Sequence, residues 1–291
     1  MTQRQRGARG RRRRQHATRK QVVAGVGLSL GAALGMTATA EAADFTVTSL
    51  TDDGSGGLTL REAITAADNG GGNDRILFRS GLTGTITLNG TQLPLIDEPL
   101  EIVGPGASEL AVSGADASRI LSVNGAVDLT ISDLRLTAGK TASGGGAIYS
   151  NNADLIIRGA TISQNEQAFA GAIYTDGGAA TIENSTISRN TTTSGGPGGI
   201  LSTGGGPLTV RNSTFSGNTA SFAGAVYSLN ETATIESSTF SGNRGTSGGP
   251  GGILSSGGGM IARGLAQFQE ARQSSAFHGR FFGLRDRRAC N

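Results

Sequence analysis

Short apolar stretches alternate with turns rich in glycine, asparagine and serine along much of this 291-residue chain. Four clear copies of this pattern lie 25, 28 and 25 residues apart, at 157–165, 182–190, 210–218 and 235–243. A longer period of 53 residues is superimposed, because the segment FAGAIY at 169–174 returns as FAGAVY at 222–227. Apolar runs bounded by such turns predict short β-strands rather than helices.

A single unit of this size cannot bury its apolar side chains, whereas units stacked as coils bury them against one another. Each strand would hydrogen-bond to the equivalent strands of the neighbouring coils, about 4.8 Å away. The repeats therefore predict an all-β fold, a parallel β-helix with coils of 25–28 residues. Aligned residues form columns along the axis of such a solenoid, and four apolar columns are expected to point inward. They are Leu155, Ala180, Leu208 and Ala233; Ile157, Ile182, Val210 and Ile235; Ile162, Ile187, Phe215 and Phe240; and Ile148, Ile173, Ile200, Val226 and Ile253.

Two polar columns are predicted as structural ladders. The asparagine column is Asn165, Asn190, Asn218 and Asn243. We expect it to close each coil, because asparagine tolerates a left-handed backbone and stacked amides can hydrogen-bond to one another. The charge column is Arg158, Glu183, Arg211 and Glu236. It faces outward and alternates in sign, so we interpret it as an element that sets the register of the coils, although each exposed pair contributes little to stability.

The region before the clear repeats predicts a cap and further strands. Residues 59–62 (TLRE) form a capping box, and Leu60, Ala63, Ile64 and Ala67 share one face of the helix that would follow. This short helix is expected to cover the open N-terminal end of the core. Strands are expected at 85–88, 100–103, 110–113, 120–123 and 129–136, and residues 85–259 would form about seven coils. Glycines before each isoleucine of the fourth inward column are expected to permit a sharp bend.

Two sets of motifs resemble those of known proteins. The segments GGAI at 145–148 and FSGN at 215–218 and 240–243 resemble the repeats of chlamydial-type polymorphic outer-membrane proteins, and similar repeats occur in many secreted bacterial right-handed β-helix proteins. Upstream, LTLREAI at 58–64 is similar to the CSLREAI-type segment that opens many such proteins, although Leu58 stands where that motif has cysteine. The resemblance covers residues 45–259 and implies a right-handed parallel β-helix at or beyond the cell surface. It implies no established activity.

The chain is expected to consist of an export signal peptide (1–42), an N-terminal cap with a short helix (43–84), the β-helix repeats (85–259) and an off-pattern, arginine-rich tail (260–291). An arginine-rich start, an apolar stretch over 22–36 and A-x-A cleavage sites at 38–42 predict export, with a mature start near Glu41 or Ala43. The run Arg11–Arg14 leaves open whether the route is the general secretory or the twin-arginine pathway. A basic nucleic-acid-binding tail and a retained signal anchor are the alternatives. No other stretch could cross a membrane.

Residues 260–291 break the repeat pattern. A shift of 53 residues aligns them with the coil that begins at Leu208, which places Arg263 in an inward column and loses the threonine and asparagine columns. We interpret this segment as a non-native end, such as a frameshift that truncated a longer repeat array, which would leave the mode of surface attachment undefined. The alternative is a genuine helical cap over 262–271.

The charge distribution bears on the partner. The net charge is +3, but residues 1–20 hold nine basic residues and residues 260–291 hold six. Residues 21–259 hold 10 basic and 20 acidic residues, a net charge of −10. An acidic body is unsuited to phosphate backbones, so no nucleic-acid partner is expected. Histidine occurs only at 16 and 278 and cysteine only at 290, so we predict no catalytic triad, no metal site and no cofactor.

The residue after each inward member of the fourth column should face outward. These residues are Tyr149, Tyr174, Leu201, Tyr227 and Leu254. Five apolar or aromatic side chains on successive coils would form an exposed strip, and such strips often mark binding sites. The alternative is that glycine-rich loops fold over them. We therefore interpret the protein as a secreted or cell-surface structural and binding module, adhesin-like, with a cell-surface polysaccharide or another surface protein as partner.

A carbohydrate-active enzyme, either a polysaccharide lyase or a glycoside hydrolase, is the second hypothesis. Such chemistry needs clustered carboxylates, either to hold Ca²⁺ or to act as a pair of acid and base. The acidic residues are instead scattered, and the only adjacent pairs, at 52–53 and 97–98, lie outside the clear repeats. The sequence therefore assigns no catalytic residue and favours a binding role over an enzymatic one.

Overall fold

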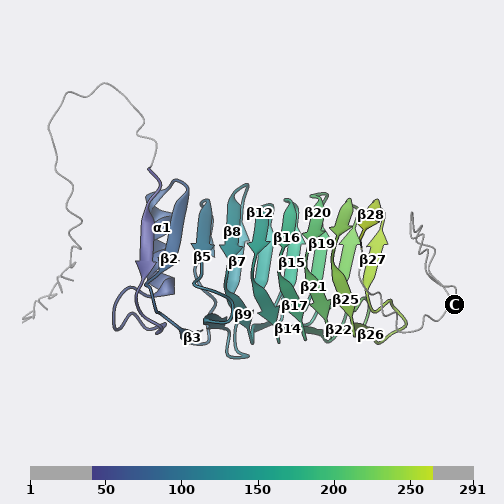
Figure 1. The fold of residues 1–291 in the computed structure, drawn as a ribbon, viewed down its shortest axis with the longest axis horizontal. Helices are drawn as coiled ribbons and strands as arrows, with labels where there is room; N and C mark the ends of the chain where they lie inside the picture. Colours follow the sequence, from purple (N-terminus) through teal and green to yellow (C-terminus); the bar gives the residue numbers. More distant parts are fainter. Residues whose placement is uncertain (1–40, 265–291) are drawn as a thin grey trace, which may run out of the picture. The chain divides into compact units, whose positions relative to one another are not determined.

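The computed structural model describes residues 41–264. Within this part, four parallel β-sheets are built from strands that successive coils contribute in turn (Figure 1). Short strands with inward branched side chains satisfy their backbone hydrogen bonds only by pairing between coils, which is why every named strand pair is parallel. The prediction of an all-β parallel solenoid is confirmed.

The nine-stranded sheet begins before the region in which the coils were expected. Its strands are β1 (Asp44–Val47), β2 (Asp74–Phe78), β5 (Leu100–Val103), β8 (Asp128–Ser132), β12 (Asp154–Arg158), β16 (Ala180–Glu183), β20 (Leu208–Arg211), β24 (Ala233–Glu236) and β28 (Met260–Arg263).

The tyrosine sheet, named for its outward residues, has seven strands. They are β4 (Leu95–Ile96), β7 (Leu121–Asn124), β11 (Ile148–Asn151), β15 (Ile173–Asp176), β19 (Ile200–Thr203), β23 (Val226–Leu229) and β27 (Ile253–Ser256).

The threonine sheet also has seven strands, and a short sheet of five lies in the turn between these two. The threonine sheet contains β3 (Gly84–Thr87), β6 (Leu110–Ser113), β9 (Arg135–Thr137), β13 (Thr161–Ser163), β17 (Thr186–Ser188), β21 (Thr214–Ser216) and β25 (Thr239–Ser241). The short sheet contains β10 (Lys140–Thr141), β14 (Glu166–Gln167), β18 (Thr191–Thr192), β22 (Thr219–Ala220) and β26 (Arg244–Gly245).

The core contains the four predicted inward columns and continues through the first coils to the helix. Leu155 pairs with Ala180, which pairs in turn with Leu208 and then Ala233, and the other three columns are equally in register. Their side chains are buried, and the rings of Phe215 and Phe240 stack with centroids 4.9 Å apart. Each fully buried side chain of this size contributes about 1.5–3 kcal/mol. Burial on every coil therefore explains how short strands become stable.

Helix α1 (Leu60–Gly70) covers the N-terminal end of the stack and packs against β1 and β2 (Figure 1). The predicted capping box is present between Thr59 and Glu62, and the four predicted apolar residues are buried. Arg61 joins the helix to the loop before it by two 2.8 Å hydrogen bonds to the carboxylate of Asp52. Asp52 also accepts a 2.9 Å hydrogen bond from the backbone N–H of Asn89, so this ion pair ties the cap to the first coil.

Three local expectations need correction. The segment 129–136 contains two strands, β8 and β9, because Asp133 turns the chain with φ 53°. The asparagine column does not use left-handed backbone; the residue before each asparagine does, with φ of 59°, 54°, 63° and 62° at Gln164, Arg189, Gly217 and Gly242. The glycines before the fourth inward column are required by close packing rather than by a bend. A Cβ at Gly146 would lie 2.6 Å from the carbonyl oxygen of Gly171.

The prediction for Arg263 was also wrong. Met260 pairs with Ala233, so this coil is one residue shorter than a strict 53-residue period requires. Arg263 therefore pairs with Glu236 in the outward charge column, and the repeat pattern extends past residue 259 to β28. The remainder of the expected tail, residues 265–291, and the expected export signal up to residue 40 lie outside the described residues.

Candidate binding groove

The tyrosine sheet places the five predicted strip residues in one column. Backbone pairing joins Tyr149 to Tyr174, then to Leu201, Tyr227 and Leu254, each next to an inward residue. Side chains alternate between the two faces of a strand, which is why residues following the inward isoleucines face outward. The rings of Tyr149 and Tyr174 have centroids 5.3 Å apart.

The strip is not evenly exposed. Leu201 is only 1% exposed, so it cannot serve as an exposed contact residue, which corrects the prediction for this position. It lies in the column between Tyr174 and Tyr227. Tyr149, Tyr174, Tyr227 and Leu254 are partly buried. The accessible surface therefore consists mainly of the tyrosine rings.

Two phenylalanines, which sequence reasoning left out of the strip, enlarge this aromatic surface. Phe169 is 50% exposed, and its ring centroid lies 6.5 Å from that of Tyr174. Phe222 lies edge-on to Tyr227, with centroids 5.3 Å apart. Both come from the turn before the tyrosine sheet. The 53-residue return of the segment FAGA(I/V)Y was a signal that could have identified them, because it carries phenylalanine and tyrosine together.

A buried glutamine shapes the turn that carries Phe169. Gln167, at the end of β14, is 2% exposed, and its Oε1 accepts hydrogen bonds from the backbone N–H groups of Phe169 and Ala170. This arrangement directs the Phe169 ring outward. Equivalent positions in neighbouring coils carry Thr192 and, at the matching end of β22, Ala220, so the glutamine is specific to this turn.

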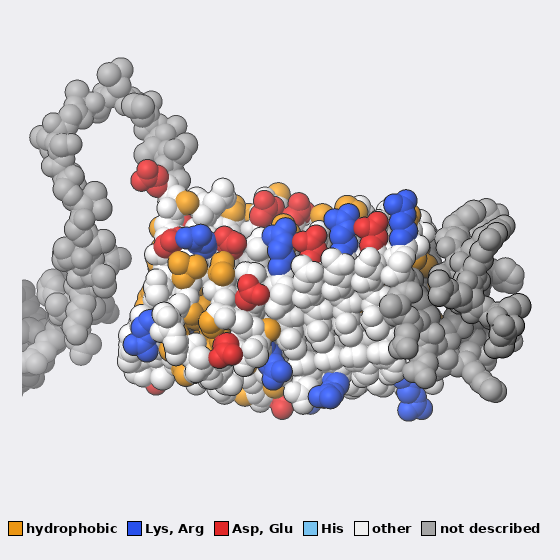
Figure 2. Space-filling model, viewed as in Figure 1, with side chains coloured by type: hydrophobic (Ala, Val, Ile, Leu, Met, Phe, Trp, Pro, Cys, Tyr) orange, Lys and Arg blue, Asp and Glu red, His pale blue; other side chains and the backbone are white. Residues whose placement is uncertain are grey.

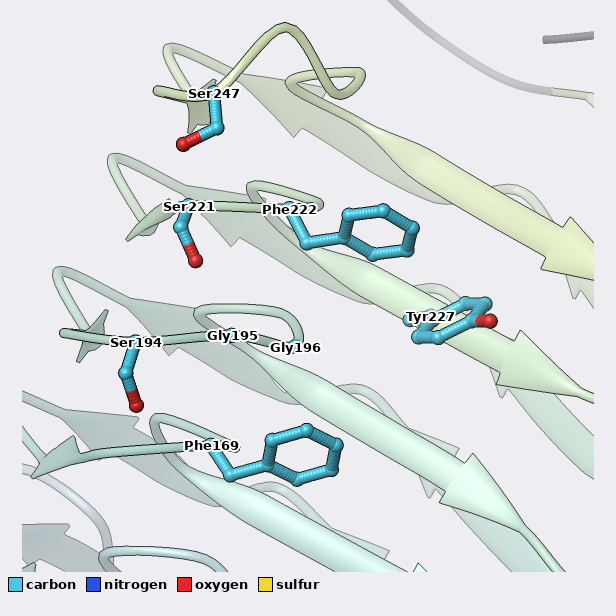
Figure 3. A pocket seen from close by; sticks show the side chains of 8 residues that line it. All are labelled: Phe169, Ser194, Gly195, Gly196, Ser221, Phe222, Tyr227 and Ser247. Atoms are coloured by element: carbon cyan, nitrogen blue, oxygen red, sulfur yellow. The ribbon is translucent and has the colours of Figure 1, made fainter.

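A cavity of about 410 Å³ opens between the two phenylalanines (Figure 3). Its lining comprises Phe169, Ser194, Gly195, Gly196, Ser221, Phe222, Tyr227 and Ser247. The glycines belong to the coil between the phenylalanine coils. A Cβ at Gly195 would lie 3.3 Å from Cδ2 of Phe169, and Gly196 has φ 64°. Absence of side chains here therefore keeps the space between the rings open.

The cavity is polar as well as aromatic, but it is uncharged. Serine side chains from three successive turns lie along it (Figure 3). The Ser194 hydroxyl is exposed and donates a 2.8 Å hydrogen bond to the carbonyl oxygen of Ala168, and Ser247 is also exposed. Ser221 Oγ is buried and has no hydrogen-bond partner among the described residues. None of the lining residues carries a carboxylate or a basic group. The groove, by which we mean this cavity and the tyrosine rings beside it, thus has a lining that can offer ring faces and hydroxyls to a ligand, but no ion pair.

A basic group lies at the N-terminal end of the tyrosine column. The Arg119 guanidinium carbon lies 5.3 Å from the centroid of the Tyr149 ring. Arg119 also donates 3.1 Å hydrogen bonds to the carbonyl oxygen of Gly145 and to Gln92 Oε1. Burial lowers the pKa of Arg119 and raises that of the Tyr149 phenol. Arg119 is therefore a positioning group that holds Tyr149 and the preceding loop, outside the cavity lining.

The charge column lies on the nine-stranded sheet. Arg158 bonds to Glu183 at 3.1 Å, Arg211 lies 3.7 Å from Glu183 and 3.1 Å from Glu236, and Arg263 lies 3.9 Å from Glu236. Figure 2 shows alternating basic and acidic side chains along one edge of the face in view, above a broad uncharged surface. Because each charge already faces opposite charges, this column offers no free charge to a ligand.

The asparagine column lies inside the turn between the threonine and short sheets. Each Nδ2 group donates to the next Oδ1, at 3.0 Å from Asn165 to Asn190, 3.0 Å from Asn190 to Asn218 and 2.9 Å from Asn218 to Asn243. Each of these Oδ1 atoms also accepts from the backbone N–H of the preceding asparagine. A second buried ladder of Ser185, Ser213 and Ser238, which the sequence did not lead us to expect, lies in the turn between the nine-stranded and threonine sheets.

Within residues 41–264, Glu231 is an ionisable side chain that is buried without a hydrogen-bond partner. Glu231 is 4% exposed, and neither carboxylate oxygen has a hydrogen-bond partner among the described residues. It stands two residues before the first inward column, where other coils have Ala153, Gly178 and Gly206. Burial raises the pKa of Glu231, and the nearby Ser202 and Ser228 hydroxyls oppose this shift.

Other titratable groups do not assemble into a second site. Across residues 41–264, no group of three or more His, Cys, Asp or Glu side chains is placed to hold a metal ion. Asp68 raises the pKa of Asp97 through a hydrogen bond, but this pair is separate from the groove. The described part of the chain also contains no helix long and apolar enough to span a membrane.

These features define a parallel β-helical solenoid with an aromatic groove on one face. The sequence from residue 113 to 264 matches the family model of the right-handed β-helix region, and the chain belongs to this family. Among solved structures, pectate lyase Pel9A is similar, with 17% sequence identity and a TM-score of 0.39 over 69% of this chain. The matched region spans 55% of that lyase, and this likeness carries no inference about activity. No curated protein matches the sequence.

Proposed function

We propose that this protein is an exported cell-surface binding module, adhesin-like in its action, that uses the aromatic groove as its contact surface. The observation that carries the proposal is the contact of outward tyrosine rings with Phe169 and Phe222, together with the open cavity that Tyr227 and both phenylalanines line. Solvent-accessible aromatic groups gathered on one face are unfavourable in water unless a partner covers them. Aromatic side chains also provide large contact areas at low entropic cost.

Export is the second part of the proposal, and it rests on the arginine-rich start, the apolar stretch and the cleavage sites near residue 40. Cell fractionation and N-terminal sequencing of the mature chain test it. We expect a mature start near Glu41 or Ala43 and surface or extracellular material. Recovery of the full-length chain with nucleic acid would instead support the basic-tail alternative.

Binding is tested with the purified mature chain, which is labelled and added to intact cells of the producing species and of candidate hosts. We expect saturable binding that falls at least tenfold when Tyr149, Tyr174 and Tyr227 are all replaced by serine. Unchanged binding by this triple variant, with an unchanged unfolding temperature, would contradict the assignment of the groove.

An enzymatic role remains the second candidate, and a direct assay separates it from binding. The mature chain is incubated with acidic and neutral polysaccharides, with and without Ca²⁺, and new reducing ends or unsaturated products are measured. We expect no turnover, because no paired carboxylates line the groove. Release of products above the level of a heat-treated control would favour the lyase or hydrolase hypothesis.

A further inference from the structure

We propose that the groove binds an extended, uncharged glycan whose chain runs along the axis of the solenoid. This inference rests on the proposed binding function and names the class of ligand. It is carried by three features of the same cavity: rings that recur on alternate coils, a glycine gap between them, and hydroxyls without a charged group.

The spacing of the rings favours a periodic ligand. Phe169 and Phe222 occupy turns two coils apart, with Gly195 and Gly196 on the coil between them. Neighbouring coils are separated by about 4.8 Å, so the two turns lie about 9.6 Å apart along the axis. This distance is close to the repeat of a disaccharide in an extended β-linked glycan. Alternate sugar units could therefore contact the two phenyl rings, while the intervening unit lies over the glycines.

The chemistry of the lining favours a sugar over an apolar peptide. A pyranose has an apolar C–H face that packs against an aromatic ring, and hydroxyls around its edge. The groove provides both partners, since Phe169 and Phe222 flank it and Ser194, Ser221 and Ser247 lie beside them (Figure 3). Ser194 and Ser247 are exposed, so their hydroxyls are the ones that a ligand can reach, whereas Ser221 Oγ is buried.

The absence of charge in this lining favours an uncharged glycan. Acidic polysaccharides carry a carboxylate or sulfate on many units, and binding them needs basic side chains or bound cations. The eight lining residues are phenylalanine, tyrosine, serine and glycine only. Arg119 is committed to Tyr149 and to backbone oxygens at the far end of the column. A uronic acid polymer would therefore lose hydration of its charges without gaining a partner.

Titration calorimetry of the mature chain with defined oligosaccharides tests this inference. The probes are the β-1,4-linked hexasaccharides of glucose, N-acetylglucosamine and mannose, the β-1,3-linked hexasaccharide of glucose, and polygalacturonate as the acidic polymer. We expect at least one neutral hexasaccharide to bind, and polygalacturonate to bind at least tenfold more weakly.

Variants locate the binding. The pair Phe169→Ala and Phe222→Ala should weaken binding at least tenfold, and Gly195→Ala should weaken it several-fold because the added methyl narrows the gap next to the Phe169 ring. The matched control is Leu95→Ala. Leu95 is 43% exposed and aligns through Ser122 with Tyr149 in the same outward column, two coils away from it and outside the cavity. The affinity of the Leu95→Ala variant for the hexasaccharide should stay within twofold of that of the unsubstituted chain. Thermal unfolding verifies that all variants are folded.

The inference is overturned if no neutral hexasaccharide binds, if the double phenylalanine variant retains full affinity, or if polygalacturonate binds best. If no neutral hexasaccharide binds, the chain can still bind cells. A protein partner would be identified if that cell binding depends on the tyrosines and disappears after the cells are treated with protease. The proposed binding function would then stand while the glycan inference fails. Loss of both cell binding and glycan binding would contradict the two together.

Discussion

The asparagine column and the charge column are built in the same way but in opposite environments. Both repeat one side chain position on successive coils, and both link each coil to the next by side-chain contacts. The asparagines are at most 4% exposed, whereas the arginines of the charge column are about half exposed or more. A hydrogen bond whose loss strands buried groups matters far more than an ion pair that water and salt can replace. Burial, rather than repetition alone, therefore determines how much such a contact contributes to stability.

The largest expected effect is at the centre of the asparagine column. Asn190→Ala removes hydrogen bonds to Asn218 Oδ1 and to the carbonyl oxygen of Ile162. It also strands the backbone N–H of Asn165 and removes one of the acceptors of Asn165 Nδ2. We expect the free energy of unfolding to fall by about 3–5 kcal/mol, because several buried polar groups lose their partners. Urea denaturation followed by circular dichroism measures this change.

The matched control is Asn151→Ala, which removes a 2.6 Å hydrogen bond to Asn124 at an exposed site. It should cost less than about 1 kcal/mol, because water replaces the lost partner. If the two alanine variants are equally stable, burial does not distinguish these asparagines and the comparison is wrong.

Glu231 is a buried carboxyl without a hydrogen-bond partner among the described residues, so removing its charge should increase stability rather than reduce it. Folding raises the pKa of this carboxyl, because burial disfavours its charged form. The contribution of the carboxyl to stability is therefore present below its unfolded-state pKa and is lost as the pH rises through its folded-state pKa. Glu231→Gln should therefore increase stability by about 1–3 kcal/mol at pH 8 and by much less at pH 4. Unfolding curves recorded across this pH range give the comparison, and a difference independent of pH would argue against a strained carboxyl.

A sign reversal in the charge column should have a smaller effect. Glu183→Arg places three basic side chains in succession, since Arg158 and Arg211 flank this position. We expect a loss of about 1 kcal/mol at low ionic strength that shrinks when salt is added. The stability of the Glu183→Gln variant, which removes the charge without reversing it, should lie between those of the unsubstituted chain and the Glu183→Arg variant. A loss that does not respond to salt would mean that packing rather than charge is responsible.

The end of the same column should contribute least. Arg263 lies 3.9 Å from Glu236 and its side chain is 74% exposed. Arg263→Ala should therefore change stability by less than about 0.5 kcal/mol, and the unfolding midpoint should be unchanged within error. A measurable loss would show that β28 depends on this contact as well as on its backbone pairing.

Much of the architecture could be predicted because it depends on local alternation. The inward columns, the capping box of α1 and the strands β5 and β6 follow from residues close in sequence, and the structure has them as expected. The register of the last coil could not be predicted, because a turn one residue shorter moves Arg263 from an inward to an outward column. Turn length depends on how a loop packs against the coil before it, which repeat alignment does not contain.

Some features of the groove could likewise be predicted from the sequence and others could not. The tyrosine column could be predicted from the residue that follows each inward isoleucine, and the repeated segment FAGA(I/V)Y contains Phe169 and Phe222. The burial of Leu201 and the placement of the two phenyl rings around one cavity could not be predicted. These depend on side chains of one coil lying beside the turn of another, with Gln167 shaping that turn from inside.

The sequence by itself determined that the chain forms a parallel solenoid, which side chains alternate inward and outward, and which columns repeat. It could do so because strand alternation and coil stacking are imposed by spacing along the chain. Only the tertiary structure decided which outward side chains stay accessible, which turns meet around a cavity, and which polar groups are buried without a partner. Those properties depend on packing between coils, where residues from different turns compete for the same space and for the same hydrogen bonds.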